Sequence, residues 1–238
     1  MKIAGQISAE ALAAGGAAVK PGATTREVDK VVHDYILKAG ATPSFLGLYD
    51  FPNASLISVN DEVIHGIPGD RVIEEGDIVC IDTGACIGGF HGDNAATFPA
   101  GKVKPEELQF LADVKASLYA GIEMAIAGNR VGDISSAIEN YNRSRGYGLL
   151  TNYTGHGIGR EVHEDPNVPN VGSAGHGPRL QNGMTIAIEP MVTMGGDDVY
   201  ELSNGWTIVT KDHTIGAHFE HTVAITPNGP LILTPALY

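Results

Sequence analysis

The sequence predicts an α+β fold of two similar halves, each with two helices followed by strands, that face each other across a shared site. Apolar residues at helical spacing open each half, and short strand-like segments bounded by glycine and proline follow them. A faint internal repeat relates the halves, because a shift of 106 residues aligns Gly22 with Gly128 and Tyr35 with Tyr141.

Two helices are expected in the first half. Residues near 3–19 fit the first helix, which a Pro-Gly pair ends. Thr24 and Glu27 have the Thr-x-x-Glu spacing of a capping box, so the second helix begins there. We then expect a loop over 41–55 and a strand over 57–67.

The second half opens with a helix at Pro105, because proline is favoured at the first helical position. A second helix is expected from about Asp133 to Arg145, and strands and loops fill the rest of the chain. Five apolar residues of the first helix should share its buried face: Leu108, Leu111, Val114, Leu118 and Ile122.

The most informative segment is 78–98, where two strand-like runs flank a two-residue Gly-Gly turn at 88–89. Such a hairpin pairs Gly84 with Asp93, and Asp82 has the parity of Gly84, so both carboxylates lie on one face. Diagonal cross-strand neighbours are about 7–8 Å apart. Two unpaired carboxylates at so short a distance need a cation between them, so the hairpin predicts a divalent metal site.

Three residues elsewhere supply the missing ligands. His156 lies in the glycine-rich loop TGHGIG, Glu189 ends an apolar run, and Glu220 lies in a segment that alternates like a strand. Carboxylates with one imidazole suit Mn, Fe, Co or Zn better than a metal that prefers thiolates. Five ligands exceed the three of an ordinary catalytic zinc, so two ions are expected. His91 shares a face with Asp93, so it could also be a ligand, although a structural or ligand-supporting role is expected.

Charge and composition argue against several classes of protein. The chain has 15 basic and 28 acidic residues and a net charge of −13, which argues against nucleic-acid binding and against an anionic membrane surface. No apolar run approaches the ~18–20 residues of a transmembrane helix. Cys80 and Cys86 lie too far apart along one strand to form a disulfide, so we expect free thiols and a cytoplasmic location.

An ordered set of motifs resembles the type I methionine aminopeptidases. The chain contains, in sequence, VNDEVIHGIP, GDIVCIDTGACIGGFHGD, GHGIGREVHEDP, IAIEPMV, NGWTIVTKD and FEHTVAIT. The resemblance spans nearly the whole chain and implies the pita-bread (creatinase/aminopeptidase) fold, with two pseudo-symmetric α/β halves around a curved antiparallel sheet. It implies a single catalytic domain over residues 1–238 that removes the initiator methionine when the second residue is small.

The resemblance also implies a dinuclear centre that binds Co, Mn, Fe or Zn. Asp93 and Glu220 would bridge the two ions, and Glu189 would also act as the general base. The full set of implied metal ligands is Asp82, Asp93, His156, Glu189 and Glu220.

Four residues would contact the substrate without ligating metal. His65 would lie at the scissile nitrogen and His163 at the oxyanion, while Trp206 and Phe51 would line the methionine pocket. Some relatives have a larger or hydroxylated aromatic residue where this chain has Phe51. The implied partner is the N-terminal methionine of nascent polypeptides, which suggests transient contact with the ribosome, and we expect a monomer.

Two other functions fit parts of the pattern. An Xaa-Pro aminopeptidase or prolidase usually has an additional N-terminal domain, for which 238 residues leave no room. A binding protein that kept the fold and lost catalysis would typically have lost ligands, whereas all five are present here. Peptides with proline in second position would identify the first alternative, and a chelator-insensitive partner interaction without peptidase activity would identify the second.

Overall fold

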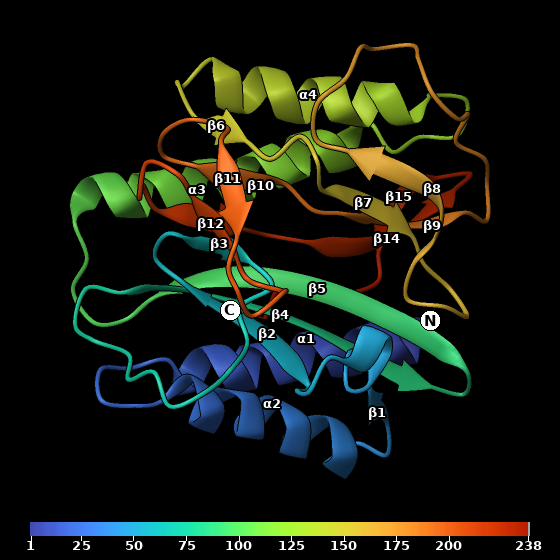
Figure 1. Cartoon of the computed structure of the whole chain (residues 1–238). Helices are drawn as coiled ribbons and strands as arrows, with labels where there is room; N and C mark the ends of the chain where they lie inside the picture. The colour runs from blue at the N-terminus through green and yellow to red at the C-terminus, as the bar shows by residue number, and fades with distance from the viewer. Residues whose placement is uncertain (238) are drawn as a thin grey trace.

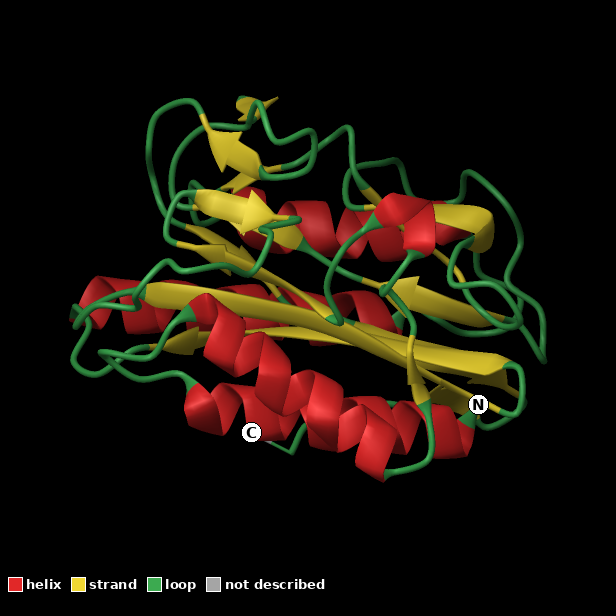
Figure 2. Cartoon of the chain, turned by 60° about the horizontal axis from the view of Figure 1, so that its bottom comes forward, coloured by secondary structure: helices red, strands yellow, loops and turns green. Residues whose placement is uncertain are grey.

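Two helix pairs enclose the strands from opposite sides in this computed structural model, which describes residues 1–237 (Figure 1). In the first half, α1 (Lys2–Ala18) packs on α2 (Thr25–Lys38). In the second half, α3 (Pro105–Glu123) packs on α4 (Val131–Arg143). Figure 2 brings α1 and α2 forward, beneath the long strands that they cover. The predicted order of two helices followed by strands in each half is confirmed.

The helix boundaries follow local sequence signals. The capping box of α2 forms as predicted: the Glu27 N–H donates to Thr24 Oγ1 at 3.2 Å, and the Thr24 N–H donates to Glu27 Oε2 at 2.8 Å. The prediction for Leu108 was wrong, because its side chain is 50% exposed. At 3.6 residues per turn, Leu108 lies roughly 120° around α3 from Val114, outside the buried face.

Strands of the first half form a four-stranded sheet in which β4 pairs with β1, β2 and β5. The loop expected over 41–55 also contains a 3₁₀ turn, and the strand expected over 57–67 is two strands, because Asn60 turns the chain with a φ of 61°. The elements are β1 (Thr42–Pro43), η1 (Leu48–Asp50), β2 (Ser55–Val59), β3 (Glu62–Ile64), β4 (Ile78–Ile87) and β5 (Phe90–Pro99).

The β4–β5 hairpin has the predicted register. Gly84 pairs with Asp93, and the turn uses Gly88 and Gly89 with φ values of 62° and 76°. Glycine adopts these left-handed conformations without steric cost. Asp82 pairs with Ala95, so the two carboxylates are diagonal neighbours on one face of the hairpin, as expected.

The second half contains a five-stranded sheet, and two three-stranded sheets hold its remaining strands together with β3 of the first half. The five-stranded order is β15 (Gly229–Ile232), β14 (His221–Thr226), β9 (Thr185–Ile188), β7 (Thr154–Gly157) and β8 (Glu164–Pro169). One three-stranded sheet is β13 (Gly216–His218), β10 (Met191–Thr193) and β6 (Gly148–Leu149). The other is β11 (Val199–Glu201), β12 (Ile208–Thr210) and β3.

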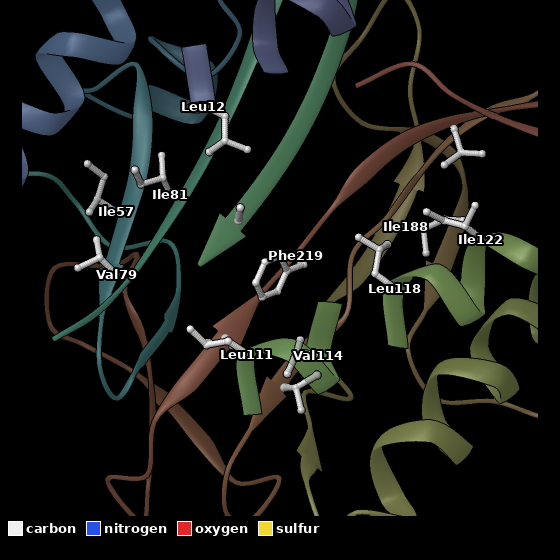
Figure 3. Close-up of a cluster of buried hydrophobic side chains, with 14 of the residues drawn as sticks. Leu12, Ile57, Val79, Ile81, Leu111, Val114, Leu118, Ile122, Ile188 and Phe219 are labelled. Atoms are coloured by element: carbon white, nitrogen blue, oxygen red, sulfur yellow. The ribbon is translucent and has the colours of Figure 1, made fainter. Parts of the chain in front are cut away.

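One hydrophobic cluster joins the halves. Figure 3 shows Leu12 and Ile81 from the first half, Leu118 and Ile188 from the second, and Phe219 between them. Each is at most 3% exposed. Burying a side chain of this size stabilises the fold by about 1.5–3 kcal/mol. This core therefore holds the strands of both halves, and the polar residues at their ends, in a fixed relation.

Cys80 and Cys86 are free thiols, as predicted. Cys80 is buried in β4, and burial raises the pKa of its thiol well above the ordinary range. Among residues 1–237, no helix combines the length and the apolar character needed to cross a bilayer.

Candidate metal centre and substrate pocket

Five predicted ligands from both halves meet at one buried cluster. Ligand atoms of Asp93, His156 and Glu220 all lie within 4.8 Å of one another. His156 Nε2 is 3.9 Å from Asp93 Oδ2 and 3.5 Å from Glu189 Oε1. Asp82 lines the same cavity as these four side chains. The structure therefore brings together all five residues that the sequence singled out as ligands.

Two of these residues are presented differently from the expectation. His156 lies in strand β7 rather than in a loop, at a register shift between Gly155 and Gly157. Glu220 lies in the break between β13 and β14, because its N–H donates to the Ala95 carbonyl oxygen of β5 at 2.9 Å instead of continuing a strand ladder.

The carboxyl groups of the cluster lack compensating partners. Burial raises the pKa of Asp93 to about 8. It also raises the pKa of Asp82, Glu189 and Glu220 well above the usual range, and the neighbouring carboxylates add to the effect. Asp82 Oδ1, Asp93 Oδ1 and Glu220 Oε1 are buried without a hydrogen-bond partner within residues 1–237. Converging acidic oxygens of this kind fit divalent cations.

The tautomer of His156 suits a ligand. Its Nδ1 lies 2.9 Å from the Gly157 carbonyl oxygen, which can only accept, so Nδ1 carries the proton. Its Nε2 lone pair then faces Asp93 and Glu189. Burial, with the neighbouring His163 as a second cause, lowers the pKa of His156 to about 4, so the ring is neutral at pH 7. A neutral imidazole oriented by a backbone carbonyl is a typical metal ligand.

His218 is a site residue that the sequence analysis missed. Its Nε2 is 3.4 Å from Glu189 Oε2, its side chain is buried, and burial lowers its pKa to about 3. One signal in the sequence pointed to it, since His218 precedes Glu220 by two residues and so shares its parity in a strand. His91, by contrast, has Nδ1 2.8 Å from Ser44 Oγ, in keeping with the structural role expected of it.

A cavity of about 230 Å³ opens beside the acidic cluster. All four predicted substrate residues line it: His65, His163, Phe51 and Trp206. The Phe51 and Trp206 rings meet edge to face with centroids 4.8 Å apart, within a second apolar cluster that also contains Phe45, Leu56 and Val162. The cavity thus has an acidic end and an apolar, aromatic end.

The two histidines of the cavity are held by other rings. His163 meets His156 edge to face at 4.5 Å between centroids, and Tyr49 stacks on His163 at 5.9 Å between centroids. His65 has a φ of 61°, in the left-handed region that non-glycine residues rarely adopt, and burial lowers its pKa to about 4. Strain of this kind concentrates at functional sites.

The sequence matches the profile of metallopeptidase family M24 over residues 1–227. It is 50% identical to a methionine aminopeptidase of Clostridium perfringens, over 98% of this chain and 94% of that protein. It is 45% identical to methionine aminopeptidase 1 of Bacillus subtilis, over 91% of this chain and 87% of that protein.

Solved structures have the same fold. The crystal structure of methionine aminopeptidase from Thermotoga maritima superposes with a TM-score of 0.96 at 42% identity and covers 98% of this chain and 94% of that chain. A prolidase from Pyrococcus furiosus has a TM-score of 0.80 at 26% identity, with 98% of this chain and 62% of that chain covered. With its predicted pita-bread fold confirmed, the chain belongs to metallopeptidase family M24.

Proposed function

We propose that this protein is a methionine aminopeptidase that removes the N-terminal methionine of polypeptides whose second residue is small. The observation that carries the proposal is the convergence of Asp82, Asp93, His156, Glu189 and Glu220 at the acidic end of an apolar cavity. Relatives named methionine aminopeptidase match the chain over nearly its full length, which supports the same activity here.

Two divalent ions would be held by these five side chains. Co, Mn, Fe and Zn all suit such a ligand set. Bound ions would supply Lewis-acid chemistry and a water of lowered pKa. Their positive charge would also offset the repulsion among the buried carboxylates, whose pKa values are raised by burial and by one another.

Glu189 would act as the general base. Its two carboxylate oxygens face His156 Nε2 at 3.5 Å and His218 Nε2 at 3.4 Å, so its orientation is constrained from two sides. A carboxylate fixed beside the scissile bond can accept the proton of an attacking water and pass it to the leaving amine.

His163 and His65 would act on the peptide group. Desolvation lowers the pKa of His163 and so favours its neutral form, and a neutral imidazole can donate one N–H to the developing oxyanion. His65 lines the same cavity, where its ring would contact the scissile nitrogen.

The apolar end of the cavity would bind the methionine side chain. Phe51 and Trp206 provide ring edges and faces there, and contacts between a thioether and an aromatic ring contribute about 0.3–1.5 kcal/mol. A pocket this small, closed by aromatic rings, would accept one unbranched side chain. The whole chain would act as one catalytic unit, a cytoplasmic monomer that meets nascent chains near the ribosome.

A prolidase-like activity is the nearest alternative, because the fold is shared. The experiment is release of the N-terminal residue from Met-Ala-Ser, Met-Gly, Met-Pro, Leu-Gly and Ala-Pro peptides, each with Mn, Co, Fe or Zn. The proposal predicts cleavage of methionine before small residues and no cleavage of Leu-Gly. Cleavage only before proline would contradict the proposal.

A further inference from the structure

The two halves touch beside the acidic cluster at three points of one register, two made by threonine hydroxyls and one by backbone groups alone. At one end, Thr97 Oγ1 of β5 donates to the His218 carbonyl oxygen at 2.8 Å and accepts the His218 N–H at 3.0 Å. In the middle, the Glu220 N–H donates to the Ala95 carbonyl oxygen at 2.9 Å.

At the other end the roles of the strands are exchanged. Thr222 Oγ1 of β14 accepts the Asp93 N–H at 2.9 Å and donates to the Asp93 carbonyl oxygen at 2.8 Å. Each step of two residues along β5 therefore matches a step of two residues in the opposite direction along the 218–222 segment. This is the register of an antiparallel pair, although β5 and β14 form no regular ladder.

In that register, each threonine hydroxyl makes the two hydrogen bonds that the backbone N–H and C=O of an opposite residue would make in a regular ladder. In an antiparallel pair, a residue exchanges an N–H and a C=O with the residue opposite, and a hydroxyl can donate once and accept at the same time. Thr97 is 5% exposed and Thr222 is fully buried. Without the Thr222 hydroxyl, the buried N–H and C=O of Asp93 would both lose this partner. Without the Thr97 hydroxyl, the His218 N–H would lose this partner, and the His218 C=O would keep only the weak contact with Cys80 Sγ at 3.8 Å.

These contacts connect the site across the boundary between the halves. Asp93 is supplied by the first half and Glu220 by the second, and their ligand atoms fall in the same 4.8 Å group. Thr222 fixes the backbone of Asp93, and the Ala95 contact fixes that of Glu220. Thr97 fixes His218, whose ring lies against Glu189.

We propose that Thr97 and Thr222 are positioning residues that set the separation of the Asp93 and Glu220 carboxylates across the two halves. The proposal rests on the metal-holding role that the proposed function gives these two carboxylates. A hydroxyl-mediated register holds the two ligands at one spacing before an ion arrives, so less reorganisation opposes binding.

The test compares four variants of these two threonines, and one control variant, with the wild-type protein. Thr97→Val and Thr222→Val remove the hydroxyl at nearly constant shape, whereas Thr97→Ser and Thr222→Ser keep it. Thr210→Val is the matched control, because Thr210 is fully buried and its hydroxyl donates to the Thr214 carbonyl oxygen, outside this register. Each protein is stripped with a chelator and titrated with Mn²⁺ by calorimetry, and its thermal unfolding is recorded without metal.

The valine variants are expected to bind Mn²⁺ roughly 10–100-fold more weakly than wild type, as losses of residues that orient metal ligands do. The serine variants should bind close to wild type. Thr210→Val should unfold at a lower temperature yet bind Mn²⁺ normally, which separates loss of positioning from loss of stability. Folded valine variants with wild-type Mn²⁺ affinity would overturn the proposal.

If a valine variant does not fold, Thr97→Ala and Thr222→Ala, which remove the hydroxyl without putting a methyl group in its place, undergo the same titration and are judged by the same criterion. No peptide is present in the titration. A wild-type protein that binds Mn²⁺ but releases no methionine therefore contradicts the proposed function alone. A wild-type protein that binds no divalent ion overturns both.

Discussion

His218 Nε2 lies 3.4 Å from Glu189 Oε2, and both side chains belong to the buried acidic cluster. Among the described residues, neither ring nitrogen of His218 has a hydrogen-bond partner of standard geometry. The neutral ring can turn one N–H toward Glu189 and so limit the orientations of the proposed base.

His218→Leu should therefore lower kcat for Met-Ala-Ser by roughly 10–100-fold with little change in KM, the size of effect seen when a group that orients a metal ligand is lost. His218→Gln should retain most of kcat, because its amide nitrogen can donate near the position of Nε2. Steady-state kinetics check this. An unchanged kcat in the leucine variant would show that His218 does not act through Glu189.

The buried carboxyls predict how the metal-free protein responds to pH. Asp93 has a pKa of about 8 in the fold and about 3.9 in an unfolded chain, so the folded state retains a proton that the unfolded state loses. Its contribution to stability is present at low pH and is lost as the pH rises toward 8. The buried histidines have lowered pKa values, so they make the free energy of unfolding rise with pH, but only below about pH 6.5, the pKa of an unfolded histidine.

With chelator present, the free energy of unfolding should fall between pH 6.5 and 8, by up to about 1.4 kcal/mol per pH unit for each group that titrates. Urea unfolding at several pH values measures the slope. Asp93→Asn should flatten the slope, and excess Mn²⁺ should reverse it. A stability that rises over this window in the metal-free wild type would contradict the assignment.

Trp206 is expected to contribute to methionine binding rather than to the fold, since its side chain is only partly buried at the cavity wall. Trp206→Ala should reduce kcat/KM for Met-Ala-Ser by up to about tenfold, which corresponds to the loss of a thioether–aromatic contact. Tyr200→Ala, an exposed aromatic residue outside the cavity lining, is the control and should leave kcat/KM unchanged. Equal effects of both changes on kcat/KM would contradict a role of Trp206 in binding the methionine side chain.

Tyr49 combines backbone strain with a site contact. It has a φ of 50° and stacks on His163, while its neighbour Asp50 has a φ of 65° and lies outside the cavity lining. A non-glycine residue in the left-handed conformation destabilises the fold by about 1–2 kcal/mol. Replacing it with glycine removes this strain but costs about 0.5–1 kcal/mol, because glycine loses more conformational entropy on folding. Tyr49→Gly and Asp50→Gly should therefore both stabilise slightly in chemical unfolding.

Only Tyr49→Gly should also raise KM or lower kcat, because it removes the ring that covers His163. If Asp50→Gly impaired catalysis as much as Tyr49→Gly, the effect would come from a general loosening of the loop and not from the tyrosine ring.

The parts of the site that depend on short-range rules could be predicted from sequence. A two-residue Gly-Gly turn fixes its own hairpin register, so the relation of Asp82 to Asp93 follows from local chemistry. The capping box of Thr24 and Glu27 is equally local. The prediction that Leu108 is buried failed because an apolar residue at the edge of the apolar face of a helix can be either buried or exposed.

The remaining features depend on contacts between distant segments. Glu220 leaves its strand because Ala95, in the other half, accepts its N–H, and no local pattern encodes that partner. The register shift at His156 arises from the pairing of β7 with β8. His218 gains its role in the site only from the approach of Glu189, which lies between β9 and β10 and is distant in sequence. Such pairings are visible only once the two halves are assembled.

The central claim is that this buried cluster uses divalent metal and Glu189 to release N-terminal methionine. The most direct measurement is free methionine release from Met-Ala-Ser by chelator-treated protein, before and after Mn²⁺ is added, for the wild type and Glu189→Ala. The account predicts release only from the metal-loaded wild type, with turnover at least about 10²-fold lower in the variant. Equal release without metal, or near-normal turnover by folded Glu189→Ala, would contradict it.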